Sequence, residues 1–255
     1  MAKELTGRLA GSYELALTVD EVVDITPRLR AIWLDADGVD RLPYEPGQDL
    51  MLSVPTHDDE VIRRRYTIRR VDDRGRIEIW FVLHGHGPAA SWAAKAAPGA
   101  PIAAIGPRGK VTVRPDCDWH LFAGDDSGAA AILAMAEVVP ARSTAIVLLE
   151  IEGPDDELET DVPVRWLHRA GAAPGDNDLL ESAIAALELP AGTGHVYLAA
   201  EKATVKRIRR QLEERGLDKE SQSPKAYWDL ARANAGHGEP LPDGWTGPDP
   251  GSRLP

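Results

Sequence analysis

The feature that most constrains the fold is a change of sequence rhythm near residue 115. Before it, short runs rich in Val, Ile, Leu and aromatic residues are separated by turn signals such as Glu45-Pro46-Gly47 and Ala97-Pro98-Gly99. Many short strands at regular spacing predict an antiparallel β-barrel. One alanine-rich segment, residues 87–97, opens with Gly87-Pro88 and interrupts this pattern. It predicts a short helix inserted between two strands.

After residue 115, apolar runs alternate with helical ones. We expect strands at Trp119–Ala123, Ala145–Ile151, Val162–Leu167 and His195–Ala199, and helices at Ser127–Val139, Asn177–Leu187 and Glu201–Arg215. Strand–helix alternation is typical of a parallel sheet with helices on its faces. The predicted fold class is therefore β plus α/β, with an N-terminal antiparallel β-barrel followed by a parallel-sheet α/β domain.

The length of 255 residues suits two modest domains. The segment Arg114-Pro115-Asp116 is the expected seam between them. We expect a barrel domain at 1–115, an α/β domain at 116–235 and a poorly ordered Gly/Pro-rich tail at 236–255.

Charge and cysteine content exclude several function classes. With 29 Lys and Arg against 41 Asp and Glu, the net charge of −12 argues against nucleic-acid or anionic-membrane partners. Cys117 is the single cysteine, so neither a disulfide nor a cysteine-built metal cluster can form within the chain. Redox chemistry would need an organic cofactor. No apolar leader or membrane-length apolar run is seen, so we expect a cytoplasmic protein without a membrane span.

The sharpest local motif is the arginine-rich strand pattern at residues 63–70. Alternation predicts two faces, with Arg64 and Tyr66 on one and Arg65, Thr67 and Arg69 on the other. A tyrosine ring beside a guanidinium suits a flavin nucleotide, because the ring can stack on the isoalloxazine and the cation can pair with the diphosphate. The Thr67 hydroxyl can hydrogen-bond the nitrogen edge of the ring. Taken alone, a solvated cationic strand is the competing interpretation.

A second motif follows the strand expected at Ile77–Leu83, where a glycine turn leads into the short helix. Gly85 and Gly87 permit close backbone approach, and the free amides of a helix amino terminus bind anions such as a diphosphate. An ordinary strand–turn–helix connection is the alternative. His84 and His86, two residues apart with no cysteine partner, make a poor zinc site, so we predict no metal site.

These motifs occur in a specific order along the chain. Arg-x-Tyr-Thr-x-Arg at 64–69 is followed by the His-Gly…Gly-Pro-Ala…Trp-Ala run at 84–93 and by Gly106-Pro107-Arg108-Gly109, then by segments at 124–132 and 164–169 and the pair Tyr227-Trp228. The ordered set spans roughly residues 13–230 and resembles the siderophore-interacting proteins, a family of FAD-dependent ferric-siderophore reductases. The resemblance implies a ferredoxin-reductase-like architecture, with a six-stranded FAD-binding barrel and a nicotinamide-binding α/β domain.

The resemblance also implies the cofactor-binding residues. They are Arg64, Tyr66, Thr67, Ile68 and Arg69 for the flavin; His84, Gly87, Pro88, Ala89, Ser91 and Trp92 for its phosphates and adenosine; Gly124, Asp125, Asp126 and Ser127 for the face that NAD(P)H approaches; and Tyr227 and Trp228 near the flavin ring. For Asp126 we also expect a helix N-cap.

The implied activity is electron transfer from NADH or NADPH through FAD to a ferric siderophore, which releases ferrous iron in the cytoplasm. The flavin carries the electrons, so no catalytic side chain is expected. Reduction loosens the metal because ferrous iron binds hard oxygen donors less well than ferric iron does. An anionic iron complex favours a basic rim, for which the candidates are Arg63, Arg65, Lys202 and Lys225. We expect a monomer.

Departures from the family pattern leave alternatives open. Ala130 stands where the family usually has proline, and Ala199-Ala200-Glu201-Lys202 stands where it usually has Gly-Glu. One alternative is a ferredoxin-reductase-like flavoprotein that exchanges electrons with a protein partner such as a ferredoxin. The other is a non-catalytic flavin- or siderophore-binding protein.

The identity of the nicotinamide donor is also open. Glu150 and Glu152 follow the second strand of the α/β half, where an acid can accept from a ribose hydroxyl and disfavour a 2′-phosphate. This favours NADH. Arg142, Arg165 and Arg169 are contrary signals, because a cation in this region can bind the 2′-phosphate of NADPH.

Overall fold

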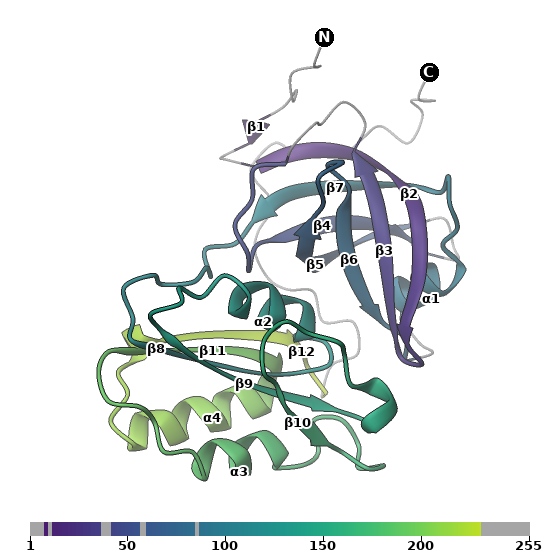
Figure 1. The fold of residues 1–255 in the computed structure, drawn as a ribbon. Coiled ribbons are helices and arrows are strands. Elements are labelled where there is room, and N and C mark those ends of the chain that lie inside the picture. Colours follow the sequence, from purple (N-terminus) through teal and green to yellow (C-terminus); the bar gives the residue numbers. More distant parts are fainter. Residues whose placement is uncertain (1–7, 10–11, 37–41, 57–59, 85–86, 231–255) are drawn as a thin grey trace.

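The computed structural model describes residues 8–9, 12–36, 42–56, 60–84 and 87–230. The predicted tail at 236–255 lies outside these residues. Figure 1 shows a barrel above a second sheet, with helices on both faces of the latter. No helix in the described ranges is long and apolar enough to cross a membrane.

The first sheet is a closed antiparallel barrel, as predicted. Its strands are β1 (Arg8–Leu9), β2 (Ser12–Thr26), β3 (Leu29–Ala36), β4 (Asp49–Pro55), β5 (Val61–Val71), β6 (Ile77–Val82) and β7 (Pro101–Arg108). They follow the order β1-β2-β3-β6-β5-β4-β7, and pairing of β2 with β7 closes a six-stranded barrel to which β1 is added. Helix α1 (Pro88–Lys95) lies between β6 and β7. Alternate residues such as Leu17, Ile32 and Leu52 fill the interior and are 2 % exposed or less.

The second sheet is parallel throughout. It contains β8 (Trp119–Asp125), β9 (Thr144–Ile151), β10 (Arg165–His168), β11 (Gly194–Glu201) and β12 (Gln222–Trp228), with helices α2 (Ala129–Ala136), α3 (Leu179–Ala185) and α4 (Lys202–Glu214) and 3-10 turns η1 (Pro154–Asp156) and η2 (Lys219–Ser221). The order is β10-β9-β8-β11-β12, so the chain reverses its direction of travel across the sheet between β8 and β11. Such a reversal is where ligands bind in open α/β sheets.

Two strands of this sheet differ from the expectation. The strand expected from Val162 begins only at Arg165, because Pro163 breaks the pattern just before it. β12 is not recognisable as a strand in the sequence, since Pro224 lies in its middle. Proline is tolerated there because β12 is an edge strand that pairs only with β11.

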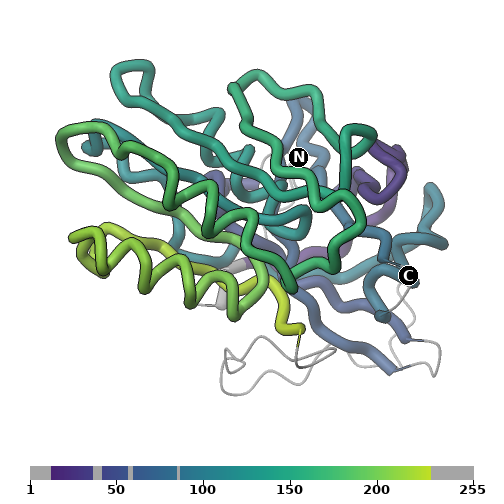
Figure 2. The backbone as a smooth tube through the Cα atoms, turned by 90° about the horizontal axis from the view of Figure 1, so that it is seen from below, coloured from purple at the N-terminus to yellow at the C-terminus, as the bar shows by residue number. Residues whose placement is uncertain are grey.

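The helices form two layers around this sheet. In Figure 1 α2 lies between the barrel and the sheet, whereas α3 and α4 cover the opposite face, and Figure 2 shows these two helices from their own side. All eight residues of α2 are buried, because the barrel covers the helix side that the sheet leaves open. In α4 only the stripe Thr204, Val205, Ile208 and Leu212 is buried, as its amphipathic sequence predicts.

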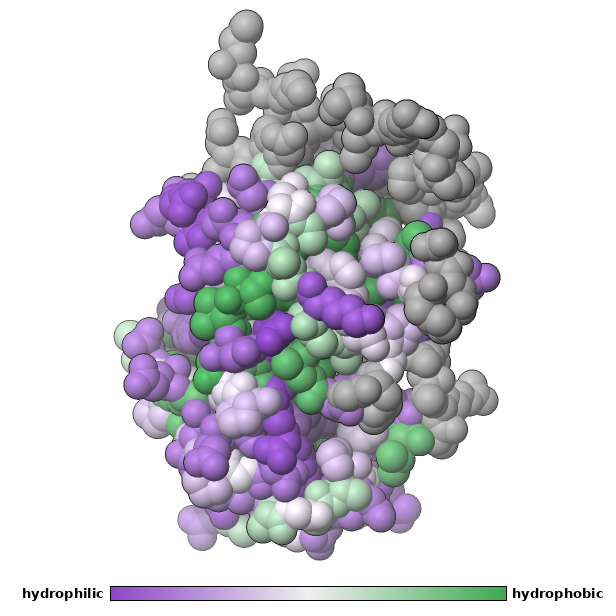
Figure 3. All heavy atoms as spheres, turned by 90° about the vertical axis from the view of Figure 1, so that its right-hand side faces the viewer, coloured by the Kyte–Doolittle hydropathy of each residue, from purple (hydrophilic) through white to green (hydrophobic). Residues whose placement is uncertain are grey.

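One apolar cluster contains residues of both the barrel and the α/β half. Ile25, Leu29, Trp80 and Val82 of the barrel pack in the cluster formed by α2 and the strands beneath it. On the face drawn in Figure 3, hydrophobic side chains gather in the middle and are interrupted by hydrophilic ones. We propose that the domains divide within residues 109–118, between the end of β7 and the start of β8.

Candidate functional site

Strand β5 has an unusual pairing pattern. It pairs with β4 from Val61 to Thr67, but the pairing with β6 is confined to Ile68–Val71. Within the described strands, the amino-terminal half of β5 therefore has one backbone edge that β6 does not cover. Such an edge presents amide and carbonyl groups that a ligand can use.

One face of β5 carries an aromatic row that leads to α1. The Tyr66 ring lies 4.3 Å, centroid to centroid, from that of Phe81 on β6, and Phe81 lies 5.6 Å from Trp92 on α1. Burial raises the pKa of Tyr66 to about 12, so its hydroxyl stays protonated. Arg64 lies on the same face and donates from Nη1 to the Arg63 carbonyl at 2.8 Å. The Tyr66 ring therefore connects the uncovered strand edge to the helix.

The other face of β5 carries Thr67 and Arg69, as the alternation predicts, and it points to the α/β half. The Thr67 and Tyr227 hydroxyls are hydrogen-bonded at 2.7 Å. Arg69 donates from Nη1 to Oε2 of Glu137, which follows α2, at 2.7 Å, and its guanidinium lies over the Trp80 ring. β5 is therefore the predicted flavin strand and also one of the strands that link the two halves.

Asp49, on β4 of the barrel, binds one cation from its own half and one from the α/β half. Arg65 binds its carboxylate with two hydrogen bonds of 2.9 Å, and Lys225 Nζ on β12 lies 2.7 Å from Oδ2. Asp49 is 1 % exposed, so this charge depends on both partners for its solvation. Burial opposes the charged form of Lys225, but the Tyr227 and Asp49 oxygens outweigh it and raise the pKa of the lysine.

The four expected substrate-binding cations do not form one group. Arg65 and Lys225 meet at Asp49, and Arg63 is half-buried two positions before Arg65 on β5. Lys202 is the first residue of α4 and pairs with Asp229 at 2.8 Å. The described residues contain no cluster of three or more His, Cys, Asp or Glu side chains that could hold a metal ion.

The amino terminus of α1 has no side-chain cap. Gly87 is the N-cap residue with φ of 86°, a conformation that favours glycine, and Pro88 follows it. Ala89 and Ala90 are buried, and the Ser91 amide already donates to the Gly87 carbonyl at 2.9 Å. Gly85 and His86 lie outside the described residues, and the His84 and Ser91 side chains are exposed.

These features test whether FAD suits the barrel. Helix α1 has an uncapped start and carries Trp92, from which the aromatic row leads through Phe81 to Tyr66 on the strand whose edge is uncovered up to Thr67. Together they offer amides to a diphosphate, a ring for stacking, and backbone and hydroxyl groups for a heterocycle edge. The residues present therefore fit the group.

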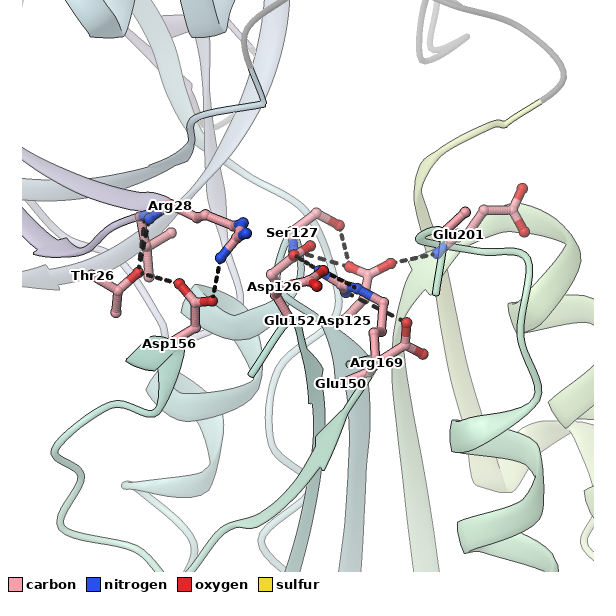
Figure 4. Close-up of polar contacts among 12 residues, drawn as sticks. Thr26, Arg28, Asp125, Asp126, Ser127, Glu150, Glu152, Asp156, Arg169 and Glu201 are labelled. Atoms are coloured by element: carbon pink, nitrogen blue, oxygen red, sulfur yellow. Dashed lines mark hydrogen bonds and ion pairs between the residues drawn. The ribbon is translucent and has the colours of Figure 1, made fainter. Parts of the chain in front are cut away.

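At the carboxyl end of the parallel sheet, both carboxylate oxygens of Asp125 accept hydrogen bonds (Figure 4). Its Oδ1 accepts from the Ser127 amide at 3.0 Å and hydroxyl at 2.5 Å, and its Oδ2 accepts from the Glu201 amide at 3.0 Å and Trp228 Nε1 at 2.8 Å. Burial, and then the charge of Asp126, raise the pKa of Asp125 to about 7. Trp228 is thus directed into this end of the sheet.

The expected N-cap role of Asp126 is wrong. The N-cap of α2 is Gly128, without a side-chain hydrogen bond. Asp126 instead accepts from Arg169 Nη2 at 2.7 Å, because a buried guanidinium on β10's carboxyl side attracts it away from the helix. Gly124 and Gly128 have a packing role: a Cβ at Gly124 would lie 2.4 Å, and one at Gly128 2.0 Å, from the Ala199 carbonyl oxygen.

Several linking residues are missed by sequence reasoning. Asp49 and Glu137 each bind a predicted flavin-face arginine or its neighbour, and Asp156 accepts from Thr26 Oγ1 at 3.1 Å and Arg28 Nη1 at 2.8 Å (Figure 4). The one sequence signal that could identify such a linking residue is an isolated acid at the border of an apolar run. Asp49, directly before Leu50, is an example. The identity of the partner has no sequence signal, because each pair joins distant segments.

Comparison with known proteins agrees with this geometry. The family model of the siderophore-interacting FAD-binding domain matches residues 39–111, and that of the siderophore-interacting protein matches residues 117–231. The chain belongs to the siderophore-interacting protein family. A siderophore utilization protein from T. fusca has a similar solved structure, with a TM-score of 0.81 and 32% identity over 89% of this chain and 96% of that one.

Two curated relatives of this family member are named as reductases. The ferric vibriobactin reductase ViuB of Vibrio cholerae is 32% identical over 69% of this chain and 66% of its own length. An NADPH-dependent ferric-chelate reductase of Escherichia coli is 27% identical over 65% of each chain. The ferredoxin reductase in carbazole 1,9a-dioxygenase, at 19% identity and a TM-score of 0.69 over 85% of this chain and 70% of that one, shares the fold. The chain is therefore an oxidoreductase of ferredoxin-reductase-like architecture with an FAD-binding domain.

Proposed function

We propose that this siderophore-interacting protein reduces the iron of a ferric siderophore with electrons from NAD(P)H, with FAD as its cofactor, and that ferrous iron is released in the cytoplasm. The observation that carries the proposal is the position of the uncovered β5 edge. It ends at Thr67, where the barrel meets Tyr227 of the α/β half. A cofactor on that edge lies between the two halves.

The residues that would hold FAD follow from the barrel geometry. Tyr66 offers a ring, Arg64 a cation for the diphosphate, and the start of α1 offers uncapped amides. The Thr67 hydroxyl and the Ile68 backbone border the same edge, and Arg69 holds its far end against Glu137. When bound, FAD accepts a hydride and can give up its electrons singly.

The α/β half would receive the nucleotide at the carboxyl ends of its strands. A small groove lies there between the halves. Its lining includes Arg28 and Asp156 from the interdomain link, and Asp126 and Glu152 from the strand ends. The groove joins the strand ends to the barrel, which supports approach of the donor from this side.

The substrate side would use the cations near β12. Arg65 and Lys225 share the single carboxylate of Asp49, so this group of three keeps a net positive charge in a chain of net charge −12. A local excess of positive charge favours an anionic iron complex. Such a complex needs only an electron, since the ferrous product binds hard oxygen donors less well.

The proposal is tested by an anaerobic absorbance titration of the protein loaded with FAD. NADH and NADPH are added in parallel, followed by a ferric siderophore and a ferrous-iron trap. We expect the flavin absorbance to bleach with a nucleotide and to return as trapped ferrous iron appears. Bleaching only by a reduced iron–sulfur protein would instead support exchange with a protein partner, and a chain that takes up no FAD would refute the proposal.

The matched variants are Tyr66→Ala and Tyr13→Ala. Tyr66 lies in the aromatic row beside the uncovered edge, whereas Tyr13 is on β2 and pairs with Gly106 of β7. We expect Tyr66→Ala to weaken FAD binding at least about tenfold, because a stacking partner is lost. Tyr13→Ala should leave FAD affinity unchanged. Equal affinity in both variants would contradict the proposed position of the cofactor.

A further inference from the structure

Three strand ends bring a guanidinium and three carboxylates together at the site proposed for the nucleotide. Asp126 follows β8, Glu150 and Glu152 lie at the end of β9, and Arg169 follows β10. We propose that this group, here called the Arg169 cluster, rejects a 2′-phosphate and makes NADH the preferred donor. This inference rests on the proposed function, because it concerns the donor of that reaction.

The Arg169 guanidinium is already neutralised by the chain itself. Its Nη2 donates to Asp126 at 2.7 Å, its Nη1 to Glu150 at 3.4 Å, and its Nε lies 3.5 Å from Glu152 Oε2 (Figure 4). Its side chain is only 2 % exposed. The Asp126 and Glu150 charges outweigh burial and raise the pKa of this arginine, so it remains a cation bound to acids. A phosphate could bind it only by displacing a carboxylate.

The carboxylates differ in what they can offer a ligand. Glu150 is 4 % exposed and accepts a further hydrogen bond from Asn177 Nδ2 at 2.9 Å. Asp126 and Glu152 are each 24 % exposed, so their oxygens reach the solvent beside the interdomain groove that both line. Three carboxylates against one guanidinium leave an excess of negative charge. A free ribose hydroxyl can donate to such oxygens, whereas a 2′-phosphate is repelled by them.

The other two arginines that argue for NADPH lie at the wrong end of the sheet. Arg142 precedes β9 and donates to the Pro115 carbonyl at 2.5 Å, and Arg165 is the first residue of β10. In a parallel sheet these positions are at the amino ends of the strands, whereas nucleotides bind at the carboxyl ends. Lys202, at the carboxyl end of β11, is separated in the sheet order from Arg169, which follows β10, by both β8 and β9, and it pairs with Asp229.

The test compares binding of two adenosine fragments to the full chain, ADP-ribose and 2′-phospho-ADP-ribose, by calorimetric titration. We expect the wild type to bind the phosphorylated fragment at least about tenfold more weakly. Asp126→Asn and Glu152→Gln each remove one partly exposed charge and should lower the ratio of the two dissociation constants several-fold. Anaerobic flavin reduction by NADH and NADPH is measured with the same proteins and should change in parallel.

Glu214→Gln is the matched control, because it removes the same charge at the far end of α4, where Glu214 pairs with Arg210. The ratio of its dissociation constants for the two fragments should equal that of the wild type. Equal or tighter binding of the phosphorylated fragment to the wild type would overturn the inference and leave the proposed function standing. An unchanged ratio in both cluster variants would overturn the role of the cluster. Absence of binding by either fragment, with no flavin reduction, would refute the nucleotide donor altogether.

Discussion

At the scale of single residues, the buried carboxylate of Asp49 shows how this fold depends on charges that face each other across the two halves. Arg65 and Lys225 come from different sheets, and neither is paired by sequence proximity. A buried ion pair tolerates poorly the loss of one partner, because the remaining charge is left unsolvated. Asp49 has two such partners.

We therefore predict that Asp49→Asn lowers the free energy of unfolding by about 3–5 kcal/mol, measured by urea denaturation. The neutral amide cannot balance the Arg65 and Lys225 charges. The control is Asp24→Asn, since Asp24 forms a surface pair with Arg30 and its side chain is 60% exposed. That change should cost less than about 1 kcal/mol. Equal losses of unfolding free energy in the two variants would show that burial of Asp49 does not increase its contribution to stability.

Two buried histidines lower the free energy of unfolding at acid pH. His195 is 1 % exposed, and burial, followed by the charges of Arg114 and His120, lowers its pKa to about 4. Burial also lowers the pKa of His120, whose two ring nitrogens have no hydrogen-bond partner among the described residues. The pKa of a histidine is about 6.5 in the unfolded chain. Because its pKa is lower in the fold, the free energy of unfolding is highest above about pH 6.5 and decreases as the pH falls from about 6.5 toward 4.

We predict that His195→Gln flattens the fall of unfolding free energy between pH 7 and pH 5 by about 2 kcal/mol relative to the wild type. Glutamine keeps a polar group beside Ser223, which His195 contacts at 2.8 Å. Asp125, whose raised pKa acts with the opposite sign, is present in both proteins and cancels in the difference. Identical slopes for wild type and His195→Gln would contradict the prediction.

At the scale of elements, the close packing of α2 on β11 depends on a residue without a side chain. Gly128 lets the start of α2 approach the Ala199 carbonyl, and a Cβ there would be 2.0 Å from that oxygen. The clash is with backbone, so it cannot be relieved by a side-chain rotation.

Gly128→Ala should therefore cost more than about 2 kcal/mol in unfolding free energy, although alanine is the better helix former. Gly153→Ala is the control, because no atom lies within 4 Å of its added Cβ and its φ of −169° suits any residue. Thermal and urea unfolding of the two variants would be compared. A Gly128→Ala protein as stable as the Gly153→Ala protein would show that α2 moves away from β11 without cost.

The elements also show which patterns can be recognised in a sequence. The strands β8, β9 and β11 are buried apolar runs between helices, and their positions agree with the prediction. β12 has no such pattern, because among the described strands it pairs along one edge alone and Pro224 is allowed there. An edge strand is specified by the neighbour that it pairs with, and that neighbour is 20 or more residues away in the chain.

At the scale of the whole molecule, contacts between the halves hold the proposed flavin strand in place. Arg69, on β5, reaches Glu137 after α2, and Thr67 reaches Tyr227 on β12. The Arg69 side chain is 10% exposed, so its pairing carries more weight than a surface ion pair.

We predict that Glu137→Gln weakens the docking of the two halves by about 2 kcal/mol, seen as a lower melting temperature and a broader calorimetric transition. Glu213→Gln is the control, since Glu213 pairs with Arg209 along the surface of α4 at 3.6 Å. It should change the free energy of unfolding by less than about 0.5 kcal/mol, and therefore the melting temperature by less than about 2 °C. An unchanged transition in Glu137→Gln would show that apolar contacts alone hold the halves together.

The sequence by itself determined the barrel, the parallel sheet and the alternation of β5. These properties follow from periodicity and local turn chemistry, which act between residues close together in the chain. The ordered set of motifs carried the resemblance to the family. Only the tertiary structure decided that Asp126 pairs with Arg169 instead of capping α2, that Trp228 turns to Asp125, and that Asp49 joins two cations. Buried charges take whichever partners the fold brings within hydrogen-bond distance, and that choice is made by packing across the whole chain.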